Sequence, residues 1–530
     1  MSSEPQNLKH SRAGIAVAFF ILLLTWFALL HPLPAAQFKE TDIFWLLESG
    51  KNILKQSALP TVDPYSFASS KTAWIVYQWL SECIFALVSQ CGFYAVAALG
   101  LATLAYLLFV LIFKRAIKLG ANSIAAVIVV IITTCATYPE IAEVRPQLFS
   151  YVALFFLQSI AEDAWSASLN SPQVKVALAK IFVVGVFWTN CHISFPLGLA
   201  MLVLYLFSSA IADVVPRENG KLKIALSAGS FGERTRIFAL MTVIFLAATL
   251  VNPYGVNLWL FLGRLNTIYT SIEMQPLHTP INLILYFVVP TIFVWRSVAP
   301  PRLLWSLVLL AEGWQHKHLI LYFCLCSSPL VAQGVSVLLA KATRWQPISR
   351  ASEFLRQAQF TPIYPIAVIA LAIYTVYSQP LSICRSAPLI AAEYLDSHKV
   401  PDNLFCPQPS SNYLIYRYEG SRKVLMDTRA DLYDASLYSR MMNAMAGSGW
   451  EELFQQYNIN SVLMPSDDAL SRILAQSADW AKVFEDQDFS LFVRSSLLTP
   501  EQKKSGVAHP ADLGRLVHVQ KMFGTSPLAR

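Results

Sequence analysis

The chain has 530 residues, of which 55% are hydrophobic and only 14% are charged, and its formal net charge is +7. An average globular domain carries about a quarter charged residues, so this composition excludes an ordinary soluble protein and predicts an α-helical protein that crosses a membrane many times. The basic residues fall mainly in loops that would share one side of a membrane, which favours membrane topology over nucleic-acid binding as their explanation.

The first apolar stretch covers residues 13–34, and Lys9, His10 and Arg12 precede it. Such a stretch is typical either of a signal peptide or of a first transmembrane helix. We favour a helix whose N-terminus lies in the cytoplasm, because no small-residue cleavage site of convincing form precedes Lys39 and further apolar stretches follow.

Residues 39–82 form a polar loop with carboxylates close to the end of the first span. Carboxylates at a membrane surface are costly unless they have a function, and Glu40 and Asp42 are the first two in this loop. Apolar residues recur at helical spacing over 41–55, which predicts a helix in the membrane interface with Asp42 at its N-terminus. The loop contains four more candidates for a substrate cavity: Asp63, Tyr65, Trp79 and Glu82. The alternative is an ordinary connecting loop.

Further apolar segments predict membrane spans along most of the remaining chain. They lie near 93–113, 121–138, 147–163, 176–190, 195–213, 237–251, 281–296, 302–313, 319–339 and 363–378. Together with the first stretch they make roughly eleven spans by the length rule. The segment 79–91 is too short to cross and is expected to lie in the interface. The basic loops then all face the cytoplasm, as the positive-inside rule requires.

On this topology, the short outer loops carry the remaining unusual polar residues. Four cations in these loops are candidates for binding a lipid phosphate: Arg145, His316, Lys317 and His318. Further polar residues in the outer loops are candidates for lining the same cavity: His192, Asn252, Glu273 and Gln275. Because Arg145 follows two glutamates, an ion pair is the alternative there, and a cationic anchor at a span end is the alternative for residues 316–318.

The composition changes after Ser378, where the long apolar runs stop. Residues 379–498 alternate between strand and helix patterns, which predicts a small α/β domain outside the cytoplasm. The run 426–433 directly follows a predicted strand at 423–426, and its charged residues would either face a ligand or pair with one another. The polar residues 499–530 are expected to be a disordered tail.

The sequence lacks the common motifs of soluble enzymes. No GxxxxGK[ST], no GxGxxG after a strand, no HExxH and no paired CxxC of zinc spacing occurs. His316 and His318 are two residues apart and would point to different faces of a helix, so they form a weak metal site. Of the eight cysteines, only Cys384 and Cys406 lie together in a polar region, and they are the candidates for a disulfide.

Eight short motifs carry a resemblance to a known superfamily. They are residues 40–45, 63–66, 79–82, 145–150, 188–192, 252–255, 273–275 and 427–433. Together they resemble a branch of bacterial multi-span proteins related to the GT-C glycosyltransferases, which use polyprenyl-phosphate-linked sugars. The resemblance implies a GT-C-like transmembrane module over 1–378, with its first outer loop at 35–92, in the bacterial plasma membrane.

The resemblance also implies a reaction. Asp42 matches the catalytic base by position, with Glu40 as its companion, in an inverting transfer of a hexose or a pentose. The donor is a polyprenyl-phosphate sugar that enters from the lipid, and the acceptor is an extracytoplasmic glycan, lipid or protein. A divalent cation is compatible with such a site, but no residue is assigned to a metal. The sequence departs from its relatives at Leu46 and Lys51, where histidine and arginine are common.

Two other classes of function remain open from the sequence. Buried charges in a helical bundle also mark transport routes, so a transporter or flippase of a lipid-linked glycan is one alternative. A non-catalytic scaffold for envelope assembly is the other. The large outer loop after the first span and the outer C-terminal domain favour the enzyme.

Overall fold

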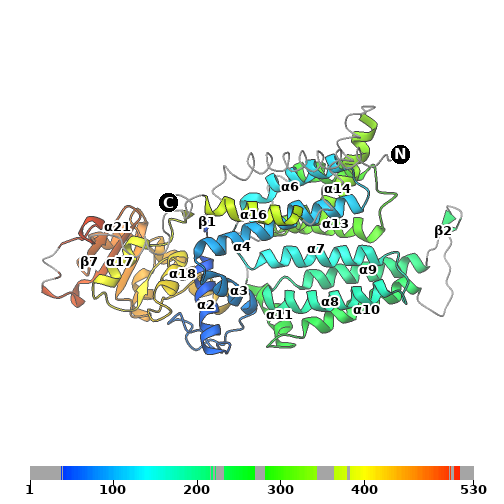
Figure 1. Cartoon of the computed structure of the whole chain (residues 1–530). Helices are drawn as coiled ribbons and strands as arrows, with labels where there is room; N and C mark the ends of the chain where they lie inside the picture. The colour runs from blue at the N-terminus through cyan, green and yellow to red at the C-terminus, as the bar shows by residue number, and fades with distance from the viewer. Residues whose placement is uncertain are drawn as a thin grey trace.

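The computed structural model describes residues 37–38, 40–141, 143–214, 217–218, 221–222, 232–268, 281–342, 363–378, 382–500, 502 and 506–513. Within these ranges the chain forms a bundle of long helices and, at one end of it, a smaller region of strands and short helices (Figure 1). The predicted first span at 13–34 and most of the predicted tail at 499–530 lie outside the described residues.

The bundle follows the apolar segments of the sequence. Its helices are α4 (Phe93–Ala105), η1 (Tyr106–Ile112), α5 (Phe113–Lys118), α6 (Ser123–Ile141), α7 (Gln147–Ala164), α8 (Pro172–Cys191), α9 (Pro196–Val214), α10 (Glu233–Thr249), α11 (Asn257–Ile268), α12 (Ile281–Thr291), α13 (Pro300–Gln315), η3 (Lys317–Leu319), α14 (Ile320–Ala342) and α16 (Ile363–Tyr377). The short strands β2 (Arg217–Glu218) and β3 (Lys221–Leu222) pair antiparallel between α9 and α10. Each predicted span between 93 and 378 therefore coincides with a helix.

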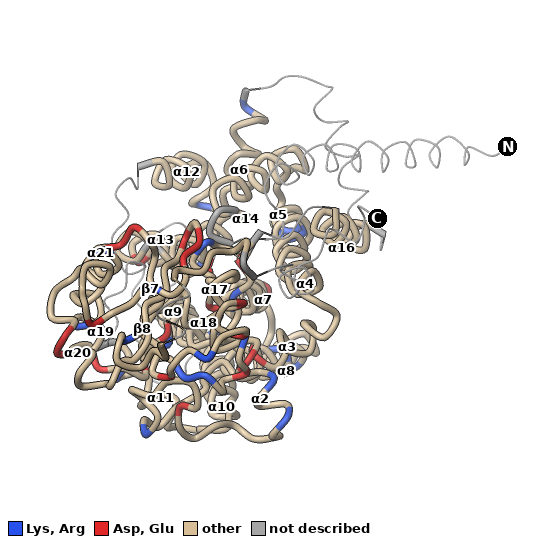
Figure 2. The backbone as a smooth tube through the Cα atoms, turned by 90° about the vertical axis from the view of Figure 1, so that its left-hand side faces the viewer, with Lys and Arg blue, Asp and Glu red and all other residues tan. Residues whose placement is uncertain are grey.

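Four helical segments of the described chain are long and apolar enough to cross a membrane: Phe93–Lys118, Pro172–Cys191, Pro196–Asp213 and Ile320–Lys341. Shorter apolar helices are also present, among them Ser123–Thr137 and Tyr364–Tyr377. In Figure 2, α6, α12 and α16 show almost no charged residues along their length. An apolar, mostly helical membrane protein is thus confirmed, whereas the number of about eleven spans stays a prediction.

Two helices of the first loop cross at very close range. They are α2 (Asp42–Gln56) and α3 (Trp79–Ser89). A Cβ atom at Gly50 would lie 2.1 Å from the carbonyl oxygen of Glu82, so only glycine allows this approach. On the buried face of α2, Phe44 and Leu47 are fully removed from solvent. The predicted helix is confirmed, and it begins at Asp42 as its amphipathic spacing indicated.

The C-terminal region combines short helices with a mixed sheet. In chain order its elements are β4 (Ser382–Ile383), α17 (Leu389–Ser397), β5 (Leu404–Phe405), α18 (Gln408–Arg417), η4 (Ala430–Leu432), α19 (Ala435–Met445), α20 (Trp450–Gln456), β6 (Ser461–Pro465), α21 (Ala469–Gln476), β7 (Trp480–Glu485), β8 (Phe489–Arg494), η5 (Ser495–Leu497) and η6 (Pro510–Leu513). The strand order is β5-β6-β8-β7, with β5 and β6 parallel and the other pairs antiparallel. The predicted strand at 423–426 is wrong, because Val424 forms only isolated bridges.

Backbone pairing brings the first loop and the C-terminal region together. The strand β1 (Gln37–Phe38) pairs in parallel with β4, and Val424 bridges both Ser66 of the first loop and Leu404 of β5. These segments therefore lie at the same end of the bundle, where Figure 1 shows α2 and α3 beside α18. Cys384 and Cys406 are both free thiols, so the expected disulfide is not formed; the Cys406 sulfur lies 3.1 Å from the Ser411 hydroxyl instead.

Candidate functional site

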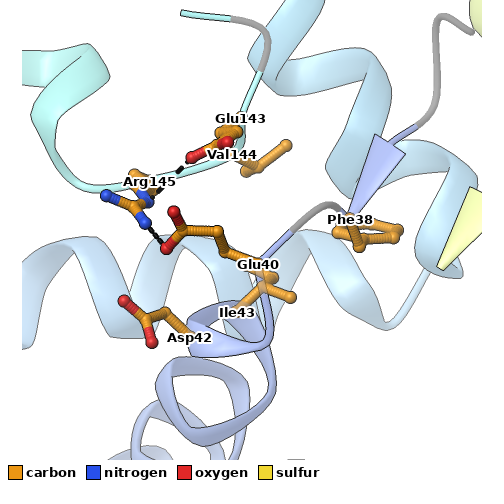
Figure 3. Close-up of a pocket in the computed structure, with 7 residues that line it drawn as sticks. All are labelled: Phe38, Glu40, Asp42, Ile43, Glu143, Val144 and Arg145. Atoms are coloured by element: carbon orange, nitrogen blue, oxygen red, sulfur yellow. Dashed lines mark ion pairs between the residues drawn. The ribbon is translucent and has the colours of Figure 1, made fainter. Parts of the chain in front are cut away.

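A pocket lies where the start of α2 meets the loop before α7 (Figure 3). Its lining is formed by Phe38, Glu40, Asp42, Ile43, Glu143, Val144 and Arg145. Three of the residues singled out from the sequence, Glu40, Asp42 and Arg145, are therefore brought together, although about 100 positions of sequence separate the first two from the third. Glu143 is the functional candidate that the residue-level analysis did not select, although it stands two positions before Arg145.

The charges of the pocket are three carboxylates around one guanidinium. Arg145 forms ion pairs with Glu40 and with Glu143, whose Oε2 lies 3.1 Å from the arginine Nε. Figure 3 shows the Asp42 carboxylate beside this pair. The predicted ion pair of Arg145 is thus confirmed. Because Glu40 and Glu143 already occupy the guanidinium, a phosphate that binds Arg145 would replace their carboxylate oxygens.

Asp42 stands in the first turn of α2, where the positive end of the helix dipole favours an anion. Its side chain is half-buried, and its Oδ1 accepts hydrogen bonds from the Thr428 hydroxyl at 2.7 Å and from the Asn412 amide at 3.1 Å. Thr428 belongs to the run 426–433 that the sequence had marked. Asn412 carried no signal, because a lone asparagine in a helix is ordinary.

Three histidines come from two other loops, and none of them lines the pocket. His192 ends α8, and its Nδ1 lies 2.9 Å from the Ser194 hydroxyl. Removal from water, together with the charges of His318 and Arg145, lowers the pKa of His192 to about 3. His192 is therefore neutral at physiological pH and can act as a hydrogen-bond partner but not as a cation. The rings of His316 and His318 lie 6.1 Å apart, while the side chain of Lys317 is outside the described part of the structure.

The remaining outer-loop candidates have structural contacts. Asn252 donates to the carbonyl oxygens of Thr249 and Gly255 at 2.8 Å and 3.2 Å, so it closes the turn after α10. The Trp79 indole donates to Asn190 at 2.8 Å and ties α3 to α8. These contacts position the loops around the pocket, and neither residue lines it. Glu273 and Gln275 lie outside the described residues.

Asp63 and Tyr65 belong to a separate, buried cluster around Arg429. Asp63 is 1% exposed and Arg429 is 3% exposed. The Arg429 Nη2 lies 2.8 Å from Asp63 Oδ1 and 2.5 Å from Asp427 Oδ2. Aromatic rings surround the guanidinium carbon, with Trp74 at 4.6 Å and Tyr65 at 5.0 Å. Asp63 therefore joins the first loop to the C-terminal region and is not exposed to a substrate.

The described residues offer no group of three or more His, Cys, Asp or Glu side chains arranged to hold a metal ion. In the pocket itself, Glu40 and Glu143 are both engaged by Arg145, which leaves no set of carboxylates converging on one point. The arrangement places a guanidinium that is paired with two carboxylates next to a third carboxylate, that of Asp42.

The fold is similar to that of solved glycosyltransferases. The apo oligosaccharyltransferase of Archaeoglobus fulgidus superposes with a TM-score of 0.52 at 10% identity, over 87% of this chain and 70% of that one. AglB of Archaeoglobus fulgidus with an inhibitory peptide and a dolichol-phosphate gives a TM-score of 0.51 at 11% identity, over 86% and 69%. Apo ArnT of Cupriavidus metallidurans gives 0.51 at 12% identity, over 92% and 99%.

These neighbours are GT-C glycosyltransferases, so the resemblance seen in the motifs is confirmed at the level of the fold. At such low identity the likeness concerns the fold alone. No protein-family model matches the sequence, and a search of curated proteins finds no match.

Glu82 gives this end of the molecule a pH dependence that can be measured. Its side chain is fully buried at the crossing of α2 and α3, where it accepts a hydrogen bond from Ser49 at 2.5 Å. Burial raises the pKa of Glu82 from 4.5 to about 8, although the hydrogen bond from Ser49 opposes the shift. Between pH 4.5 and about pH 8, the folded chain therefore binds a proton that the unfolded chain releases. The free energy of unfolding falls as the pH rises through this range.

We expect the stability of Glu82→Gln not to fall with rising pH, since glutamine keeps the hydrogen bond with Ser49 and does not ionise. One linked proton corresponds to about 1.4 kcal/mol of unfolding free energy per pH unit. The measurement is the melting temperature of the detergent-solubilised chain between about pH 6 and about pH 9. Exposed Glu452→Gln is the matched control and should follow the wild type. If Glu82→Gln loses stability with pH as steeply as the wild type, the buried carboxyl is not the source.

Proposed function

We propose that the chain is an integral-membrane glycosyltransferase that moves a hexose or pentose from a polyprenyl-phosphate donor to an extracytoplasmic acceptor. The acceptor class is a glycan, a lipid or a protein, and nucleic acid has no part in the reaction. The observation that carries the proposal is the pocket in which Asp42 lies beside an arginine with two carboxylate partners. The fold shared with AglB, which was solved with a dolichol-phosphate, supports the lipid-phosphate donor.

In the proposed reaction, the acceptor hydroxyl attacks the anomeric carbon from the side opposite the phosphate. Asp42 takes the hydroxyl proton, the bond from the anomeric carbon to the phosphate oxygen breaks, and the phosphate leaves with the electron pair. Arg145 stabilises the charge that develops on that phosphate, and His316, Lys317 and His318 are proposed to contribute positive charge from the next loop. Neutral His192 is proposed to bind a sugar or acceptor hydroxyl.

We propose that about eleven spans cross the bacterial plasma membrane, with a cytoplasmic N-terminus and an α/β domain outside. The pairing of β1 with β4 supports a common side for the first loop and the C-terminal region. An alkaline phosphatase fused after Ser378 is therefore expected to be active, because this enzyme folds only outside the cytoplasm. A fluorescent protein that requires the cytoplasm should stay dark at the same position. Fluorescence there would invert the topology and remove the shared outer site.

The central prediction concerns Asp42→Asn. Asparagine keeps the shape and the oxygen that Thr428 and Asn412 contact, but it cannot accept the acceptor proton. Loss of a general base lowers the rate by about two to four orders of magnitude. The measurement is release of undecaprenyl phosphate from a panel of undecaprenyl-phosphate hexoses and pentoses, with an envelope extract as the source of acceptors.

The control for that experiment is Asp402→Asn, which makes the same change at an exposed position. If Asp42 only caps α2, asparagine is an equally good cap and Asp42→Asn should be nearly silent. Activity within a few-fold of the wild type would therefore reject Asp42 as the base. If Glu40→Gln were silent as well, the base would lie elsewhere, whereas failure of the wild type itself to release undecaprenyl phosphate would favour a transporter over an enzyme.

Arg145→Gln is expected to act on the donor. A hydrogen bond to a charged group is worth about 1.5–3 kcal/mol, so the KM for the undecaprenyl-phosphate sugar should rise roughly 10- to 100-fold. The KM for the acceptor extract should change little. Exposed Arg472→Gln serves as the matched control. An unchanged donor KM would show that Arg145 does not bind the donor and only forms its ion pairs with Glu40 and Glu143.

A further inference from the structure

The C-terminal region contributes two hydrogen-bond donors to the Asp42 carboxylate. The Thr428 hydroxyl and the Asn412 amide approach the same oxygen, Oδ1, from positions 386 and 370 residues away in the sequence. We propose that Thr428 and Asn412 are positioning residues that orient the Asp42 carboxylate for proton transfer, so that the C-terminal region completes the catalytic site. This inference rests on the function proposed above.

The segment that presents Thr428 is fixed on both sides. Asp427 precedes it and accepts from the Tyr433 hydroxyl at 2.9 Å, while Arg429 follows it and pairs with Asp63 of the first loop. The Arg429 backbone nitrogen also donates to Asp427 Oδ1 at 2.8 Å, which closes a tight turn around Thr428. A threonine between two buried, paired charges has little freedom to move away from Asp42.

Asn412 connects the same residues from a different element. It lies on α18 and is fully buried, and the amide nitrogen that faces Asp42 also lies within 3.1 Å of Thr41 Oγ1 and 2.9 Å of Thr428 Oγ1. The helices α18 and α2 pack directly, with the rings of Phe44 and Tyr413 5.1 Å apart in an edge-to-face arrangement. Asn412 thus connects the N-terminus of α2 with the turn that contains Thr428.

This arrangement determines the direction of the carboxylate. An aspartate in the first turn of a helix can rotate about its side-chain torsions, and each rotation moves the accepting oxygen relative to a bound hydroxyl. Two donors that converge on Oδ1 restrict this rotation and give Oδ2 a defined direction. A base held within a hydrogen bond of its proton needs less reorganisation in the transition state. Thr428 and Asn412 therefore act on turnover through Asp42, without touching the substrate.

The test compares Thr428→Val, which replaces the hydroxyl with a methyl group of similar size, with Thr428→Ser, which keeps the hydroxyl. The full-length protein in lipid nanodiscs is assayed with the undecaprenyl-phosphate sugars described above. Losing one hydrogen bond to a charged group should lower kcat about tenfold, with the donor KM within about twofold of the wild type. Thr428→Ser should restore most of kcat. Exposed Thr61→Val is the matched control and should be silent.

A second comparison separates positioning from folding and from failure of the proposed function. In an Asp42→Asn background, Thr428→Val should cause no further loss, because the two residues act as a unit. If Asp42→Asn is inactive but Thr428→Val turns over at the wild-type rate, the positioning role is overturned and the base stands. If Asp42→Asn is itself active, the proposed base falls and the inference falls with it. Equal losses of kcat and melting temperature in Thr428→Val, Thr428→Ala and Thr428→Ser would assign Thr428 to folding alone and overturn the inference.

Discussion

The buried guanidinium of Arg429 is the interaction that joins the first loop to the C-terminal region. A cation removed from water is expensive, and here Asp63 of the first loop and Asp427 of the C-terminal region both neutralise it. Removing one partner of such a buried pair costs about 3–5 kcal/mol, because the other charge is left unpaired. Two segments separated by most of the bundle in sequence are thereby joined into one structural unit.

Three carboxylic acids of the first loop lie in different environments once this loop is packed against the C-terminal region. Asp63 is buried and ion-paired, Glu82 is buried with a hydroxyl partner and holds its proton to higher pH, and Asp42 stays half-buried at a helix N-terminus. Burial favours the neutral acid, whereas a paired or dipole-facing site favours the anion. Of these three acids, only Asp42 lines the pocket, where a general base could reach an acceptor hydroxyl.

The sequence predicted what depends on local pattern. Runs of apolar residues marked the helices of the bundle, and amphipathic spacing marked α2 and its start at Asp42. α12 ends at Thr291, earlier than predicted, and contains Pro290 one residue before its end. The predicted strand at 423–426 failed because only Val424 pairs there, in isolated bridges to Ser66 and Leu404, and no local pattern reveals the bridge to the distant Ser66.

For the candidate site, too, the sequence identified individual residues but not their contacts with distant parts of the chain. Glu40, Asp42 and Arg145 stood out as charges in the predicted outer loops, and the resemblance favoured Asp42 over Asp63 by position. The contacts of Asp63 with Arg429 and of Asp42 with Thr428 join residues far apart in the sequence, so no local pattern revealed them. The two glutamates before Arg145 indicated an ion pair, but the sequence could not show that Glu40 is a second partner beside Glu143. On the proposed function, a donor phosphate must displace those carboxylates. Its binding energy would therefore be spent partly on separating Arg145 from Glu40, two residues before the base, which links donor binding to the charge that Asp42 experiences.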